Sequence, residues 1–242
     1  MGPIAKTWFY VNDWLGCWLG NHLVADHPLI REHLLTRVSG KKITTIPYTA
    51  DEVTSAPEEP VRALGLEPGR YFTLIARPEP ENSVLEVVTG FSAKHRGYKL
   101  LVLGNFKESN PYHQAVKAAA SDEIMFVGAI YDKEVVQALR FHSVAYIHGH
   151  QVGGTNPSLV EAMAAGNAVI AHDNFFNRWV AGEPGCYFKG ADHFSEKLDK
   201  VLETEGRLDR MRADIFDQYH EYFTWDKVLV DYEILLTKWL PS

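Results

Sequence analysis

The stretch VAYIHGHQVGGTNPSLVEAMAAGNAVIA, residues 144–171, decides the fold class of this sequence. It begins and ends in short apolar runs, residues 144–147 and 168–171, of the kind that form buried parallel strands. Between them a loop with three glycines leads into residues 159–165, whose apolar positions have helical spacing. The order strand, helix, strand is typical of a parallel α/β sheet.

The same alternation extends through the middle of the chain. Apolar runs at residues 71–76, 99–103 and 124–127 predict three more strands. We therefore predict an α/β protein with a Rossmann-like, doubly wound parallel sheet, in which ligands bind at the carboxyl ends of the strands. The segments that separate the strands have helical spacing at residues 84–95, 112–120 and 132–141.

The two ends of the chain follow other patterns. After residue 171 we predict no further strand, and helical spacing predicts a C-terminal helical tail at residues 192–205, 208–222 and 225–240. The first 50 residues contain an aromatic-rich helix at residues 8–19 and a short βαβ unit, with strands at 22–25 and 43–46 around a helix at 28–38. A unit this short cannot form a sheet alone. Residues 49–60, rich in acids and prolines, are predicted to be a linker.

Composition argues against several classes of protein. The 242 residues are 46% hydrophobic and 23% charged, as in a globular protein with a sizeable core. The net charge of -7, without a basic stripe, argues against nucleic acid as a partner. Cys17 and Cys186 give neither a disulfide framework nor a metal-type spacing, which favours a reducing compartment. No apolar run approaches the roughly 20 residues of a transmembrane helix, so we predict a cytoplasmic protein, with peripheral contact at the inner face of a membrane left open.

An anion site is predicted where the glycine loop, residues 149–155, enters its helix. Asn156 is a candidate cap and Pro157 a candidate first helical residue, so backbone amides there would face a ligand. The helix dipole gives a bound anion only about 0.3 to 1 kcal/mol, so a diphosphate needs a cation as well. Arg77, directly after the strand at residues 71–76, is that candidate.

Two simpler interpretations remain open. Arg77 could instead pair with Glu79 or Glu81 in its own loop. The helix entry could be an ordinary capping box between Ser158 and Glu161 that binds nothing.

Four segments in this order resemble a known family. They are Arg77-Pro-Glu-Pro-Glu-Asn82, Leu101-Val-Leu-Gly104, Phe126-Val-Gly128 and the run from Gly153 to Gly166. Together they resemble the C-terminal, donor-binding domain of retaining family 4 glycosyltransferases of the GT-B fold, most closely the rhamnosyltransferase-like branch. The resemblance covers about residues 71–225 and, more weakly, the whole chain.

The resemblance implies roles for individual residues. Glu161 would bond the ribose hydroxyls, Arg77 would bind the diphosphate, and both are taken as catalytic. Backbone amides from Thr155 to Ser158 would hold phosphate or sugar, and the loop from Gly128 to Ile130 would frame the base. The substrate-binding residues predicted in this way are Asn82, Gly128, Ile130, His148, His150, Gly153, Gly154, Thr155, Asn156, Pro157, Ser158 and Asp173.

The sequence also departs from the family. The family often has a glutamate at the position of Gly153, which contacts the donor sugar, and a lysine near the position of Asn82. Gly153 would leave the sugar contact to His148, His150 or Gln151.

The histidines near this loop also raise the question of a metal. His148, His150, His172 and Asp173 follow two predicted strands that end at one edge, but their spacing is no recognised zinc pattern. We predict no metal and no cofactor beyond the substrate. Asp173-Asn174 and Asn177-Arg178 are expected to line the donor pocket or cap the next helix.

The resemblance also implies a division of the chain. Residues 1–53 would be a remnant of the N-terminal acceptor domain, residues 54–225 the nucleotide-sugar-binding domain, and residues 226–242 a C-terminal crossover helix. Because exposed strand edges attract other strands, we predict that a second chain, or a second copy of this one, covers residues 1–50.

The preferred function is transfer of a sugar from a nucleotide diphosphate sugar to a glycan or lipid-linked acceptor, with retention, as in polysaccharide biosynthesis. The alternative is a noncatalytic nucleotide-sugar-binding subunit or remnant that needs a partner chain. A dinucleotide oxidoreductase is disfavoured because no GxGxxG follows the first strand of the sheet, and a P-loop ATPase because no GxxxxGK[ST] occurs.

Overall fold

The computed structural model describes residues 2–238 and contains the predicted parallel sheet. All six strands of this sheet run parallel, in the order β5-β4-β3-β6-β7-β8. The chain builds outward from β3 to β5 and then returns to start β6 on the other side of β3. This reversal makes the sheet doubly wound and creates a crevice between the carboxyl ends of β3 and β6. The strands are β3 (Tyr71–Ile75), β4 (Lys99–Leu103), β5 (Ile124–Gly128), β6 (Ala145–His148), β7 (Ala168–His172) and β8 (Cys186–Phe188).

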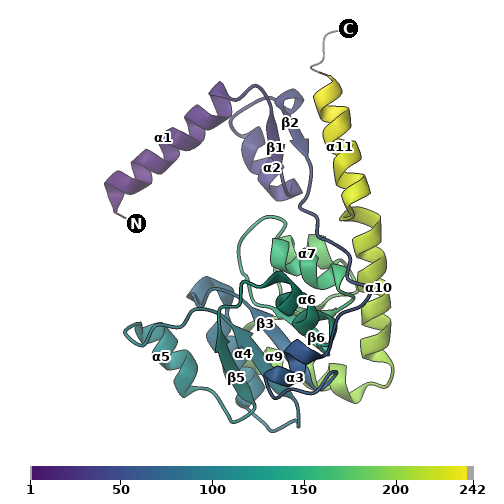
Figure 1. The fold of residues 1–242 in the computed structure, drawn as a ribbon. Coiled ribbons are helices and arrows are strands. Elements are labelled where there is room, and N and C mark those ends of the chain that lie inside the picture. The colour runs from purple at the N-terminus through teal and green to yellow at the C-terminus, as the bar shows by residue number, and fades with distance from the viewer. Residues whose placement is uncertain (1, 239–242) are drawn as a thin grey trace.

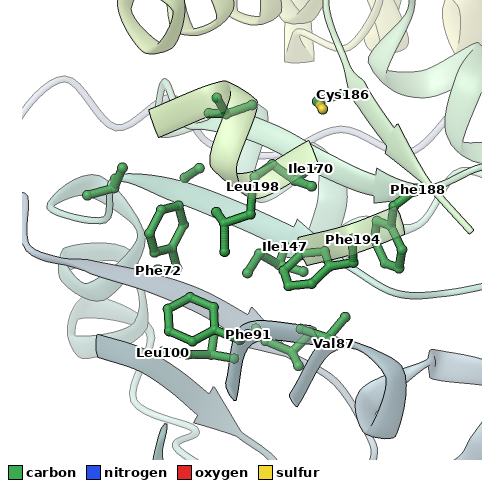
Figure 2. Close-up of a cluster of buried hydrophobic side chains, with 14 of the residues drawn as sticks. Phe72, Val87, Phe91, Leu100, Ile147, Ile170, Cys186, Phe188, Phe194 and Leu198 are labelled. Atoms are coloured by element: carbon green, nitrogen blue, oxygen red, sulfur yellow. The ribbon is translucent and has the colours of Figure 1, made fainter. Parts of the chain in front are cut away.

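Helices cover both faces of the sheet, because successive residues of each strand point to opposite sides. On one face, Phe72 and Ile147 pack against Phe91 and Phe194 in an apolar cluster (Figure 2). The other face carries Tyr146 and its neighbours under a second set of helices. The first face is covered by α4 (Val84–Ser92), α5 (Pro111–Ala118) and α9 (Gly190–Glu203), and the second by α3 (Glu59–Ala63), α6 (Lys133–Phe141), α7 (Pro157–Ala164), α8 (Phe175–Ala181) and α10 (Arg207–Tyr222).

The prediction that no strand follows residue 171 is wrong. Strand β8 pairs with β7 at the edge of the sheet and is fully buried. It has only three residues and follows Pro184 and Gly185, so the sequence lacks the length of apolar run by which the other strands are recognised. Strand β8 is recognised as a strand by its pairing with β7 and not by a pattern in its own sequence.

The first 50 residues form a separate N-terminal lobe (Figure 1). Strands β1 (Leu23–Ala25) and β2 (Ile43–Thr45) pair in parallel as a two-stranded sheet, joined by α2 (Pro28–Leu35). Helix α1 (Pro3–Leu19) extends away from the body of the molecule, and α11 (Trp225–Thr237) runs beside the lobe. Contact between Ile46 and the α11 residues Val228 and Leu235 holds α11 on the lobe.

Residues 47–58 connect the lobe to the sheet domain, residues 59–222, without a helix or strand. They nevertheless pack on the domain: the Val53 amide donates to the Ala164 carbonyl at 3.0 Å, and Ala50 is buried. Across residues 2–238, every helix is too short or too polar to cross a lipid bilayer.

Candidate functional site

Two loops meet where the order of the sheet reverses. The arginine loop, residues 77–83, follows β3, and the glycine loop follows β6. Gly149 allows their backbones to touch, because a Cβ at this position would lie 2.1 Å from the Asn82 carbonyl oxygen. Gln151 then bonds the loops together, with its amide N on the Glu81 carbonyl at 2.8 Å and its Nε2 on Ser83 Oγ at 3.0 Å. The sequence prediction that both loops share one edge of the sheet is therefore correct.

Arg77 lies exposed at this junction. Within residues 2–238 its guanidinium has no hydrogen bond or ion pair, so the pairing with Glu79 or Glu81 that the sequence left open does not form. The buried side chain of Asn82 donates from Nδ2 to the Arg77 carbonyl at 2.8 Å, and thereby shapes the loop. Arg77 is free to meet an anion.

His148 and His150 form a stacked pair behind the arginine loop. Their ring centroids are 4.4 Å apart, and His148 is fully buried. Burial, with the added effect of the nearby Arg77 charge, lowers the pKa of His150 to about 4. Burial also lowers the pKa of His148 well below its usual range. Both rings are therefore neutral near pH 7, and neither adds a competing positive charge beside Arg77.

The entry to α7 begins as the Asn156-Pro157 interpretation predicts. Asn156 is the cap, since its Oδ1 accepts from the Ser158 amide at 3.1 Å, and Pro157 is the first helical residue. The alternative capping box of Ser158 and Glu161 does not form. Pre-set φ at Pro157 and the capped amide explain why the helix starts here.

Two of the amides that were expected to be open between Thr155 and Ser158 are already used within the protein. The Thr155 amide donates to the Asp26 carboxylate at 3.0 Å, the Ser158 amide is held by the Asn156 side chain, and Pro157 has no amide hydrogen. Asp26 was not among the predicted site residues, because it belongs to the N-terminal lobe, 129 residues away along the chain. Asp26 reaches the glycine loop only when the chain is folded, so no local sequence pattern marks it.

Glu161 is oriented by Arg140, another residue that was not predicted. Arg140, at the end of α6, is 5% exposed and its Nη2 lies 2.6 Å from Glu161 Oε2. The same nitrogen donates to Ser158 Oγ at 3.1 Å, and the Ser158 hydroxyl is hydrogen-bonded to the Tyr146 hydroxyl at 2.7 Å. Arg140 sits in an amphipathic helix, where an arginine gives no local sign of being buried. The partly exposed Glu161 carboxylate is thus held in one orientation.

A cavity of about 660 Å³ lies over Glu161 and Ile130. Its size is in the range of small-molecule sites, and it combines apolar walls with a few charged groups. On its rim, Lys133 forms an ion pair with Asp51, and the Trp225 indole donates to Asp51 at 2.8 Å. The predicted residues that line it are Ile130, Asn156, Pro157, Ser158 and Glu161; other lining residues include Ile75, Tyr131 and Arg140.

The remaining predicted residues lie around this cavity or apart from it. Gly128 ends β5 with a φ of 77°, and its carbonyl accepts from the Gly104 amide at 3.0 Å. Gly153 and Gly154 form the loop next to Asp26. Asp173 is held by Arg178 at 2.5 Å and Lys189 at 3.7 Å, and the Arg178 hydrogen bond lowers the pKa of Asp173.

The candidates for the helix cap can also be placed, and so can the side chains that were considered for a metal. Of the residues that were candidates for the cap, Asn174 caps α8, because its Oδ1 accepts from the Asn177 amide at 3.0 Å. In the part of the chain that the structure describes, no group of three or more His, Cys, Asp or Glu side chains is placed to hold a metal ion.

A doubly wound parallel sheet with a cavity of about 660 Å³ beside the carboxyl end of β3 is the architecture of a Rossmann-like α/β protein. The sequence profile of the family described as Glycosyl transferases group 1 matches residues 65–216. The chain belongs to this family. Among curated proteins, none matches the chain.

Several solved structures share the fold. Alr3699/HepE from Anabaena in complex with UDP superposes with a TM-score of 0.79 at 12% identity, over 93% of this chain and 65% of that one. Sucrose-phosphate synthase from Thermosynechococcus elongatus gives 0.74 at 16% identity, over 89% and 57%. The GtfA/B complex gives 0.71 at 19% identity, over 95% and 48%. This chain therefore spans about half to two thirds of these GT-B proteins.

Proposed function

We propose that this chain binds a nucleotide diphosphate sugar and is the donor-binding part of a retaining glycosyltransferase. The observation that carries the proposal is one edge of the sheet that holds both the Glu161 carboxylate, fixed by buried Arg140, and the Arg77 guanidinium, unpaired within residues 2–238. Family membership and the UDP in the Alr3699/HepE structure support it.

In this proposal the nucleoside occupies the cavity. Ile130 contacts the base, with Gly128 allowing the strand to end there, and the free oxygen of Glu161 accepts a hydrogen bond from a ribose hydroxyl. Arg140 contributes by holding the other oxygen of Glu161. Asn156 and Pro157 form the wall toward the phosphates.

Arg77 is the residue that stabilises the leaving group in this proposal. When the bond between the sugar and the leaving phosphate breaks, negative charge develops on that phosphate, and a guanidinium beside it lowers the barrier. Arg77 supplies the positive charge, so the proposal requires no metal and no cofactor. Retention, and an acceptor that is a glycan or a lipid-linked sugar of polysaccharide biosynthesis, follow from the resemblance to the rhamnosyltransferase-like branch of family 4.

We further propose that another chain, or a second copy of this one, covers the N-terminal lobe and supplies acceptor contacts. The supporting observation is that Trp8 and Trp18 of α1 are 68% and 69% exposed. The two free cysteines support a cytoplasmic location, and peripheral membrane contact is part of this proposal. The same exposure favours one alternative function, a noncatalytic nucleotide-sugar-binding subunit that acts only with its partner.

Thermal unfolding with UDP-, GDP- and dTDP-sugars tests the proposal. A ligand at 100 times its Kd adds about 2.7 kcal/mol to the free energy of unfolding, which raises Tm by roughly 5 to 10 °C for a chain of this size. Arg77→Ala should abolish the shift. The matched control is Arg62→Ala on α3, an exposed arginine paired only with Glu58, which should leave the shift intact.

The results separate the alternatives. No shift with any sugar nucleotide would overturn donor binding, and an unchanged shift in Arg77→Ala would move the phosphate site elsewhere. Binding without transfer by the chain alone, and transfer once a partner is added, would favour the noncatalytic subunit.

A further inference from the structure

The contact between the two lobes at Asp26 points to a residue that recognises the sugar. Asp26 directly follows β1, yet its carboxylate Oδ2 accepts from the Thr155 amide of the glycine loop at 3.0 Å. Thr155 in turn donates its hydroxyl to the Asp26 carbonyl. Gly154 makes this approach possible, since a Cβ there would lie 2.2 Å from Asp26 Oδ2.

The backbone that carries Asp26 is held in place by the residue that follows it. The next residue, His27, caps α2 by accepting from the Leu29 amide at 3.1 Å. Its ring is buried and packs edge-on against Trp179 of α8, with centroids 4.6 Å apart. A carboxylate held in this way loses little conformational entropy when it meets a ligand.

One oxygen of Asp26 is available. Oδ2 is used by Thr155, whereas Oδ1 has no hydrogen bond or ion pair within residues 2–238, and the side chain is partly exposed. Gly154 lies against this oxygen, whereas Gly153 before it faces open space, because a Cβ built there would meet nothing within 4 Å. Asp26 Oδ1 is not among the fully buried side-chain atoms that lack a partner, so this oxygen is open to solvent and to a polar group of a ligand.

The loop under Asp26 spans the two ends of the proposed donor site. Gln151 is bonded to the arginine loop, and Asn156 lines the nucleoside cavity. The residues first expected to contact the sugar are buried or engaged elsewhere: His148 is fully buried, Nδ1 of His150 is buried, and Gln151 Nε2 donates to Ser83 Oγ. Compared with His148, His150 and Gln151, which were expected to take the sugar, Asp26 is therefore the better placed acceptor.

We infer that Asp26 is a specificity-determining residue whose Oδ1 accepts a hydrogen bond from a hydroxyl of the donor sugar. The inference rests on the proposed function. It means that the sugar lies between the lobes, and that the N-terminal lobe contributes directly to donor recognition. A hydrogen bond to a charged acceptor changes affinity by roughly 10- to 100-fold, and an analogue without the hydroxyl is rejected because the carboxylate then loses its partner.

The test compares Kd values of sugar nucleotides and free nucleotides by calorimetry. The probes are UDP-glucose, GDP-mannose and dTDP-rhamnose, each against its own nucleoside diphosphate, and the pair that binds wild type most tightly is used. Asp26→Asn should weaken the sugar nucleotide by about 10-fold or more and leave the free nucleotide within about 2-fold. The control Asp209→Asn, a carboxylate 84% exposed on α10, should change neither.

The variant Thr155→Val tests whether Asp26 binds the sugar itself or only holds the glycine loop in place. It removes the hydroxyl contact to the Asp26 carbonyl but keeps the Asp26 carboxylate, so it should not weaken the sugar nucleotide selectively. With deoxy analogues of the sugar, one analogue should bind wild type about 10-fold more weakly than the parent but bind Asp26→Asn equally well.

The outcomes distinguish this inference from the proposed function. If wild type binds a sugar nucleotide and Asp26→Asn lowers the affinity for sugar nucleotide and free nucleotide equally, or changes neither, the inference is overturned and the proposed function stands. If wild type binds no probe, both are overturned.

Discussion

The sheet domain and the N-terminal lobe bury apolar side chains to very different extents. In the sheet domain, both faces of the central strands are covered, and side chains such as Phe72 and Phe91 are 0% exposed (Figure 2). In α1 only Cys17 is buried, and Phe9 is 59% exposed. The two-stranded sheet of the lobe is below the size that is stable by itself. The sheet domain is therefore self-sufficient, while the lobe needs contacts from outside itself.

The largest expected effect is on the free energy of unfolding, and it compares a buried phenylalanine of the sheet domain with an exposed one of α1. Phe91→Ala removes a ring that packs edge-on against Phe72 at 5.8 Å and should lower the free energy of unfolding by about 3 to 5 kcal/mol. Phe9→Ala in α1 should change it by less than about 0.5 kcal/mol, because the ring is mostly in solvent already. Urea unfolding followed by circular dichroism measures both. Equal losses would show that α1 is part of the same core.

A smaller effect on stability is expected from His150, at the carboxyl edge of the sheet, and it depends on pH. Burial, aided by the Arg77 charge, lowers its pKa to about 4, against about 6.5 in the unfolded chain. Between these pH values the unfolded chain binds a proton that the native protein does not, so stability falls as the pH is lowered from 6.5 to 4. Above pH 6.5 this group contributes no pH dependence.

The size of the effect is about 3 kcal/mol, the free-energy equivalent of that pKa difference. Urea unfolding at pH values from 4 to 8 measures it. His150→Asn should flatten the profile over this window, leaving the part due to His148. A profile that is already flat in wild type would show that the stacked pair is solvated.

The sheet domain was easier to predict from the sequence than the site. Strands β3 to β7 were recognised because apolar runs bounded by loops and alternating with helical segments are typical of buried parallel strands, and the start of α7 because Asn156-Pro157 is a local signal. Strand β8, too short to show such a pattern, was missed. Asp26 and Arg140 were missed for a different reason: each acquires its role from a partner distant in sequence, and no local spacing marks a carboxylate that will bind a loop in another lobe.

The smallest expected effect on stability is that of changing two exposed tryptophans of α1, but the same change should strongly weaken binding of this chain to a second copy or to a partner chain. Trp8 and Trp18 are 68% and 69% exposed, so changing both to serine should alter the unfolding free energy of the monomer by less than about 1 kcal/mol. If these rings are covered by a second copy, sedimentation velocity at low micromolar concentration should show wild type as an oligomer and the double variant as a monomer. If a separate chain covers them, the variant should lose binding to that chain instead. A wild-type monomer with a folded lobe and no affinity for any partner would contradict the contrast between lobe and sheet domain, because α1 would then be stable with its aromatic face in water.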